Sequence, residues 1–158
     1  MKNSLLLILS SLIVVACSKE NSDTVNTQQP AGQPVTGLSS VPVSQADLDP
    51  TLIVKGERLY QQNCAVCHGR RAEGDPHWRK RKPDGKLLPP PLDGTGHTWH
   101  HSKTLLASII TKGTASQGGD MPAWGDKLSI QEIDAILTWI QSRWNKDIYK
   151  NWLEINSR

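Results

Sequence analysis

The stretch Cys64-Ala65-Val66-Cys67-His68 carries the strongest signal in this chain of 158 residues. Two thiols three residues apart on one helical turn can add to the two vinyl groups of one haem as thioethers. The next residue, His68, then faces the iron from the same side. C-x-x-C-H is the attachment sequence of c-type haem. The sequence therefore predicts one covalently bound haem c, attached through Cys64 and Cys67, with His68 as an iron ligand.

Two other kinds of site also use a C-x-x-C pair. A thioredoxin-like redox pair needs a βαβ context, and the sequence shows no alternating strand pattern. A structural zinc site needs a second pair of ligands at short spacing. The remaining cysteine, Cys17, lies near the N-terminus, so such a pair would have to come from His77, His97, His100 and His101. Free thiols are unusual in an oxidising compartment, so we favour haem over both alternatives.

Met121 is the candidate for the second axial ligand of the iron. Apart from Met1 it is the only methionine, and it lies in the Gly- and Pro-containing stretch 118–124 rather than on a helix face. A methionine is usually core filler, but a thioether sulfur binds haem iron and raises its potential. The alternative is a second imidazole, supplied by His97, His100 or His101.

The pattern of apolar residues and caps predicts an all-α fold with long loops. Helices are expected after Asp49-Pro50, from Ser102 or Thr104 up to Gly113, after the capping box Ser129–Glu132 on a stripe that reaches Trp144, and around Ile148–Ile155. Residues 69–102 show no helical period and include Pro89-Pro90-Pro91. A small helical bundle with so thin a core needs a large apolar filler, which one haem supplies.

The N-terminal region reads as an export signal followed by a linker. Residues 1–16 combine a positive start with a short apolar run, as a signal peptide does. The run ends Val14-Val15-Ala16-Cys17, which resembles the lipobox of bacterial lipoproteins and implies lipid on Cys17. We expect residues 17–45 to be this lipidated cysteine and a flexible polar linker, and residues 46–158 to be the folded domain.

From about Asp49 to Trp144 the chain resembles a class I, single-haem c-type cytochrome in a lipoprotein form. The matching residues are Gly56, Tyr60, 64–69, 90–94, 121–124 and Trp139. The resemblance implies a small helical bundle around one haem, with the first and last helices crossing where Gly56 meets Trp139 or Ile136. It also implies that a carbonyl of Pro90 or Pro91 supports His68, and it favours Met121 as the distal ligand.

The function implied is electron transfer, without enzymatic activity, on the periplasmic side of a bacterial envelope. Ser18 after the lipidated cysteine favours the outer membrane by the same resemblance. The alternatives are a haem peroxidase or ligand sensor with an open distal site, and a fixed electron-transfer subunit of a larger redox complex. Both a donor and an acceptor redox protein are expected as partners.

The net charge of the chain and the distribution of its basic residues indicate which kinds of partner it can bind. The net charge of +3 and the absence of a basic strip beside stacking aromatics argue against a nucleic-acid partner. Residues 70–86 nevertheless carry seven basic and three acidic side chains. Such a rim would steer acidic docking faces. Within it Arg79 and Arg81, together with Trp99, are candidates for pairing with the haem propionates.

Overall fold

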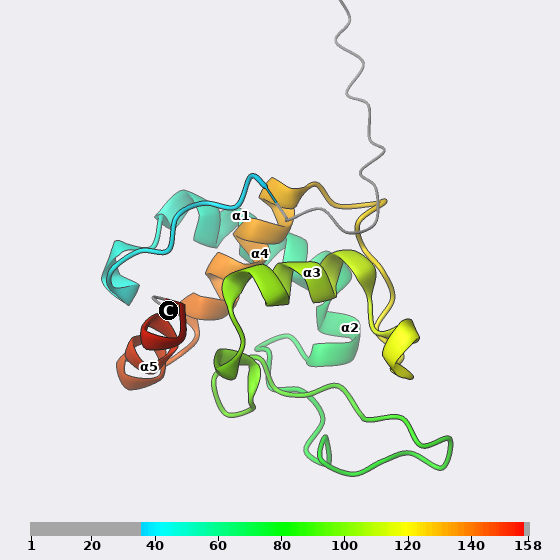
Figure 1. The fold of residues 1–158 in the computed structure, drawn as a ribbon. Coiled ribbons are helices and arrows are strands. Elements are labelled where there is room, and N and C mark those ends of the chain that lie inside the picture. The colour runs from blue at the N-terminus through cyan, green and yellow to red at the C-terminus, as the bar shows by residue number, and fades with distance from the viewer. Residues whose placement is uncertain (1–35, 157–158) are drawn as a thin grey trace, which may run out of the picture. The chain divides into compact units, whose positions relative to one another are not determined.

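The computed structural model describes residues 36–156, so the expected signal peptide, Cys17 and most of the linker lie outside the described residues. Within this range the secondary structure is helical, apart from one isolated antiparallel bridge between Arg81 and Leu87. The α-helices are α1 (Pro50–Asn63), α2 (Ala65–His68), α3 (Lys103–Lys112), α4 (Ile130–Ser142) and α5 (Lys146–Asn156), shown in Figure 1. Short 3-10 turns are η1 (Gln45–Asp47), η2 (Thr98–His100) and η3 (Ala115–Gln117). The all-α expectation is confirmed.

The helix starts lie where local sequence chemistry places them. Asp49 accepts a hydrogen bond from the Thr51 N–H, and Pro50 takes the first helical position of α1. Ser102, rather than Thr104, caps α3. Ser129 and Glu132 form the expected capping box at the start of α4. Each cap satisfies backbone N–H groups that have no partner inside the helix.

The crossing of α1 and α4 forms the centre of the domain. Gly56 packs so closely that a Cβ atom there would lie 1.9 Å from the Ala135 carbonyl oxygen and 2.9 Å from the Trp139 Cβ. One turn later, the Tyr60 ring lies 4.3 Å from the Trp139 ring, centroid to centroid. The expected close approach at Gly56 is therefore confirmed, against Ala135 and Trp139 rather than Ile136.

The residues just before α1 pack against the domain, which differs from the expectation that the linker extends to residue 45. Leu38 and Val41 contact the hydrophobic core. The Ser39 N–H donates to Asp134, and the Gln45 side chain donates to the carbonyls of Gln141 and Trp144. A polar composition without apolar period predicts a linker, but Ser39 and Gln45 bond to partners 95 or more residues away in the sequence.

The helix expected around Ile148–Ile155 is α5, and it docks on the domain through an aromatic cluster. Trp144, Tyr149 and Trp152 are buried, with ring centroids between 5.5 and 6.4 Å apart. The Trp152 indole N–H donates to the His101 carbonyl at 2.8 Å. Helix α4 ends at Ser142, so Trp144 lies beyond it, in the connection to α5.

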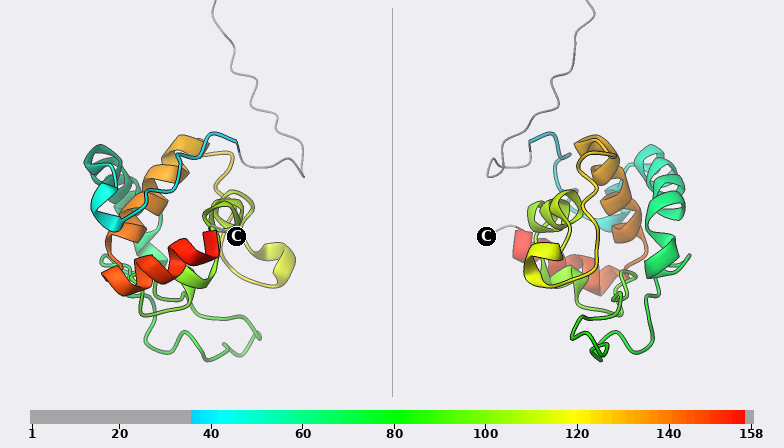
Figure 2. Two further views of the ribbon diagram at one scale, coloured as in Figure 1. Left: turned by 60° about the vertical axis from the view of Figure 1, so that its left-hand side comes forward. Right: turned by 90° about the vertical axis from the view of Figure 1, so that its right-hand side faces the viewer.

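The long segment between α2 and α3 extends away from the helices, at the bottom of Figure 1 and in both views of Figure 2. It carries the proline run 89–91 and the basic residues 70–86. Among the described residues no helix is long and apolar enough to cross a membrane.

Candidate functional site

Cys64 lies between α1 and the single-turn helix α2, and Cys67 lies within α2. The Cys64 N–H donates to the Tyr60 carbonyl, and its own carbonyl accepts from the N–H groups of Cys67 and His68. Cys64 is half-buried and Cys67 is exposed, and both are free thiols. Burial, helped by the neighbouring Cys67, raises the pKa of the Cys64 thiol to about 11. The spacing on one turn matches the geometry that the motif predicts.

His68 is oriented by a hydrogen bond to the proline run. Its Nδ1 lies 3.0 Å from the Pro90 carbonyl oxygen, so Pro90 rather than Pro91 is the partner. A carbonyl can only accept, so Nδ1 carries the proton and Nε2 of the neutral ring keeps a free lone pair. Burial lowers the pKa of His68, and the bond to Pro90 partly opposes this. A neutral imidazole oriented in this way is what a metal ligand requires.

The Pro90 carbonyl is held in place by residues that the sequence did not identify. A Cβ atom on Gly74, whose φ is +63°, would lie 2.4–2.8 Å from backbone atoms of Pro90 and Pro91. The Gly74 N–H donates to the His68 carbonyl, and the Ala72 carbonyl accepts from the Leu92 N–H at 2.8 Å. The glycines of the turns in this stretch were the available signal in the sequence. The local sequence does not show which other segment of the chain packs against these turns.

Met121 lies in the connection between η3 and α4, half-buried against the hydrophobic core. Its carbonyl accepts from the Thr114 N–H at 2.9 Å, and its N–H donates to the Thr114 hydroxyl at 3.1 Å. Gly113 adopts a φ of +67°, and a Cβ there would lie 2.6 Å from the Met121 carbonyl oxygen. Thr114 and Gly113 therefore fix the backbone of Met121, and neither was expected from the sequence.

The donors that the structure presents fit a haem c. Two free thiols stand one turn apart, the next histidine has its distal nitrogen unprotonated, and a thioether lies in a separate segment. Cys64 and Met121 both pack against the same hydrophobic core, as do Leu92 and Trp99. Thiols for thioether bonds, imidazole nitrogen and thioether sulfur are the groups that hold haem in c-type cytochromes.

Three of the other histidines, His97, His100 and His101, lie at a turn around η2 and contact other rings. The His97 ring stacks on Trp78 with centroids 5.3 Å apart, and the His100 ring stacks on Trp99 at 3.7 Å. The pKa of His97 is lowered, first by burial and then by the charges of His101, His100 and Arg79. Within residues 36–156 no group of three or more His, Cys, Asp or Glu side chains could hold a metal ion.

The side chains considered as propionate partners have other contacts here. The Arg79 guanidinium lies 4.2 Å from the centre of the Trp78 ring. Arg81 donates to the Gly85 carbonyl at 2.6 Å. Trp99 contacts His100, as described above. Their pairing with propionates stays a prediction.

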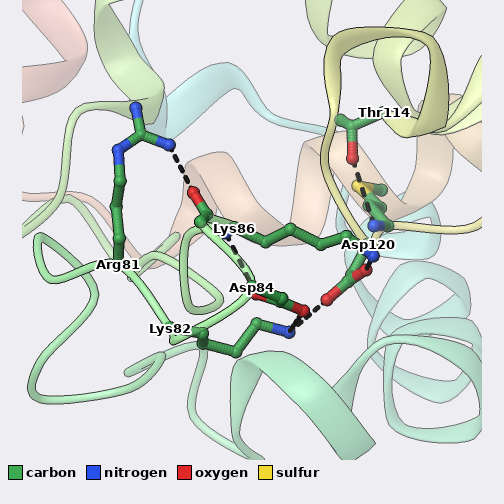
Figure 3. Close-up of polar contacts among 8 residues, drawn as sticks. Arg81, Lys82, Asp84, Lys86, Thr114 and Asp120 are labelled. Atoms are coloured by element: carbon green, nitrogen blue, oxygen red, sulfur yellow. Dashed lines mark hydrogen bonds and ion pairs between the residues drawn. The ribbon is translucent and has the colours of Figure 1, made fainter.

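Two of the seven basic residues in 70–86 are paired with an acid outside that stretch. Lys82 and Lys86 both bind the carboxylate of Asp120, the residue before Met121, as Figure 3 shows. The hydrogen bond from Lys82, followed by that from Lys86, lowers the pKa of Asp120. Sequence analysis did not identify this contact, because the partners are 34 and 38 residues apart.

The crossed helices, the C-x-x-C-H turn and the proline carbonyl on His68 together define a class I c-type cytochrome domain. Residues 51–140 match the family model described as cytochrome c oxidase, cbb3-type, subunit III. This match covers more than half of the chain, and the chain belongs to this family of haem-binding electron-transfer domains.

Several curated proteins are similar to this chain. The cbb3-type cytochrome c oxidase subunit CcoP of Azospirillum sp. (strain B510) is 31% identical over 94 residues, which are 60% of this chain and 29% of that protein. The subunit FixP of Azorhizobium caulinodans is 32% identical over 89 residues, 56% of this chain and 26% of that protein.

A thiosulfate dehydrogenase of Stutzerimonas stutzeri (strain A1501) is 33% identical over 110 residues, 63% of this chain and 33% of that protein. This chain therefore spans a third or less of the length of these relatives. No solved structure matches the chain.

Proposed function

We propose that this chain is a membrane-anchored electron carrier that passes single electrons through one covalently bound haem c. When bound, the haem supplies an iron that alternates between two oxidation states. Cys64 and Cys67 would hold it by thioether bonds, and His68 and Met121 would ligate its iron. Since both ligands would come from the chain itself, no position on the iron would be open to a substrate, which supports a carrier rather than an enzyme.

One observation carries this proposal: the hydrogen bond between His68 Nδ1 and the Pro90 carbonyl, 3.0 Å long. It leaves the far nitrogen of the ring as a ligand, directly beside two free thiols. A ligand histidine whose second nitrogen is fixed in this way is typical of metal centres. In the proposed holoprotein both thiols would be used up as thioethers and the free lone pair of His68 would bind the iron, so neither would remain as a nucleophile or a general base.

The site of action that we propose is the periplasmic side of the bacterial envelope, at the outer membrane. Support comes from the sequence Val14-Val15-Ala16-Cys17 and from Ser18. Several acyl chains on one cysteine give stable anchoring. Radiolabelled palmitate incorporated into the wild-type chain but not into Cys17→Ala, with the label in the outer-membrane fraction, is the expected result.

We further propose that electron donors and acceptors dock on the basic stretch 70–86 through acidic faces. Because Asp120 already pairs with Lys82 and Lys86, the cations left for a partner are Arg70, Arg71, Arg79, Lys80 and Arg81. Electron-transfer rates should fall as ionic strength rises. Rates that stay constant across ionic strength contradict docking by charge.

The decisive test is the absorption spectrum of the full chain, matured with haem-ligation machinery and purified in detergent. We expect a covalent, low-spin haem with the weak near-infrared band of methionine bound to ferric iron. Met121→Ala should abolish that band. A covalent haem without the band in wild-type protein, together with binding of carbon monoxide or peroxide turnover, would instead support a sensor or peroxidase.

A second candidate function is a fixed electron-transfer subunit of a larger redox complex. The names of the relatives CcoP and FixP favour it, since both are subunits of cbb3-type oxidases. Cross-linking in native membranes followed by co-purification separates a subunit from a free carrier. Reduction of the haem by thiosulfate alone would favour an enzyme, as the similar thiosulfate dehydrogenase suggests.

A further inference from the structure

The backbone of Met121 is held from the C-terminal end of α3, by Gly113 and Thr114. Thr114 exchanges two hydrogen bonds with it, as described above. Between these two residues the chain passes through Gly118, where a Cβ atom would meet nothing within 4 Å, and Gly119. Glycine loses more conformational freedom on ordering than other residues. Ordering the segment that carries Met121 therefore costs entropy, which further contacts must offset.

A turn in the long loop contacts the residue that precedes Met121. The Lys82 N–H donates to the Lys86 carbonyl at 2.8 Å, and the Gly85 N–H donates to the Lys82 carbonyl at 2.9 Å. Asp84 accepts from the Lys86 N–H, and Arg81 donates to the Gly85 carbonyl. These bonds hold the two lysines on one short turn. Figure 3 shows both side chains reaching toward Asp120.

Asp120 completes this contact by using both of its carboxylate oxygens. Oδ2 binds Lys82, and Oδ1 binds Lys86. Two ammonium groups brought together on one turn repel each other unless an anion lies between them. Asp84 offers only a longer contact to Lys82, 3.7 Å. Asp120 is therefore the carboxylate that joins the turn to the segment of Met121.

We propose that Asp120 is a positioning residue for Met121, and that it acts by binding Lys82 and Lys86. The same long loop contributes the Pro90 carbonyl that accepts from the proximal histidine. One loop thus fixes both axial ligands, the histidine directly and Met121 through Asp120. The proposal rests on the proposed function, in which Met121 binds the iron.

The test compares the holoproteins of wild type, Asp120→Asn and Asp126→Asn. Asp126 is an exposed aspartate in the same connection to α4 and serves as the matched control. Imidazole is titrated into the ferric proteins, because it competes with the thioether for the iron. We expect Asp120→Asn to bind imidazole about 3- to 10-fold more tightly, the effect expected of one or two exposed ion pairs. Asp126→Asn should match the wild type.

Charge and geometry are tested by two further measurements. Added salt should increase the imidazole affinity of the wild type and leave that of Asp120→Asn nearly unchanged, because salt screens the ion pairs. The conservative variant Asp120→Glu should keep most of the wild-type behaviour. The triple variant Asp120→Lys, Lys82→Asp, Lys86→Asp should restore resistance to imidazole that Asp120→Lys alone loses.

Three outcomes would overturn the proposal, and they are distinguishable. Equal imidazole affinities in a wild type and an Asp120→Asn that both show the methionine–iron band would overturn the role of Asp120 alone. A wild type without that band would overturn the assignment of Met121 as ligand, and the role of Asp120 with it. Thermal melts of all variants identify any that are globally unfolded. If a variant is unfolded, the salt titration of the wild type tests the proposal instead. An imidazole affinity of the wild type that does not change with salt overturns the proposal.

Discussion

The ammonium of Lys103 lies 2.6 Å from a carboxylate oxygen of Asp134, and both side chains are only 5% exposed. This buried ion pair joins α3 to α4. Lys103 also donates to the carbonyl and hydroxyl of Ser39, while the Ser39 N–H donates to Asp134. The Lys103 backbone N–H donates to Asn156 near the end of α5. Residues near both ends of the described chain therefore bond to Lys103.

Lys103→Met should lower the free energy of unfolding by about 3–5 kcal/mol, because it leaves the carboxylate of Asp134 buried without its partner. Denaturation by urea measures this change. The double variant Lys103→Met, Asp134→Leu should recover most of the loss, since a buried pair can be replaced by apolar side chains. Lys112→Met, at the exposed end of the same helix, is the control. A loss below about 1 kcal/mol in Lys103→Met contradicts the prediction.

Gly56→Ala should destabilise the crossing of α1 and α4. The added Cβ would lie 1.9 Å from the Ala135 carbonyl oxygen, which is backbone and cannot rotate away. Alanine favours a helix more than glycine, so any loss reports the steric overlap. We expect about 1–3 kcal/mol, measured by urea denaturation. Glu57→Ala, at the exposed neighbouring position, should change little. Unchanged or greater stability in Gly56→Ala would mean that the helices cross less closely.

Gly74→Ala should raise the reduction potential of the bound haem. The new Cβ would displace the Pro90 carbonyl and weaken its hydrogen bond to His68. Without that bond the imidazole is less basic and stabilises ferric iron less. A tenfold change in relative affinity corresponds to about 59 mV for one electron, so we expect a rise on the order of 10–60 mV in redox titration.

The control for this substitution is Gly37→Ala, away from the loops that carry the proposed ligands. Gly37 also has a positive φ, +96°, and a Cβ there would meet only the side chains of Ile130 and Gln131. It reproduces the backbone strain of an alanine at positive φ without the contact to Pro90. The same shift in both variants would attribute the effect to strain and not to the hydrogen bond.

Tyr149 should make stability fall between pH 10 and 12. Burial, with a smaller contribution from the charge of Asp47, raises the pKa of its phenol to about 12. Above pH 10 the unfolded chain loses this proton while the folded chain keeps it, so rising pH favours unfolding. The phenol O–H donates to the Pro42 carbonyl at 3.2 Å.

Tyr149→Phe removes the titrating group and leaves the ring. The fall in unfolding free energy from pH 10 to 12 should therefore be shallower in the variant than in the wild type. Guanidinium denaturation at several pH values measures both slopes, and the lysines contribute equally to each. Identical slopes would show that the phenol ionises in the folded chain as it does in water.

Much of the fold was predictable because its signals are local. Asp49, Ser102 and Ser129 were predicted as helix caps, since a cap bonds backbone groups two or three residues away. The expected tight position at Gly56 was also confirmed. The linker boundary differed, because the contacts of Ser39 and Gln45 are with α4 and the residue after it, far along the chain.

By itself the sequence determined the class of protein and the chemistry that its motif can perform. C-x-x-C-H places two thiols and an imidazole on one turn, and covalent bonding along five residues needs no tertiary information. The resemblance to c-type cytochromes, which the family match confirms, followed from the same residues.

Only the tertiary structure decided which groups orient and hold the predicted ligands. Neighbouring carbonyls in a proline run look alike in sequence, and the folded chain brings Pro90 rather than Pro91 to His68, with Gly74 packed against both prolines. Likewise, the pairing of Asp120 with Lys82 depends on two loops meeting in space. Hydrogen bonds and ion pairs act over a few ångströms, so partners separated by tens of residues are set by how the chain folds and not by its local pattern.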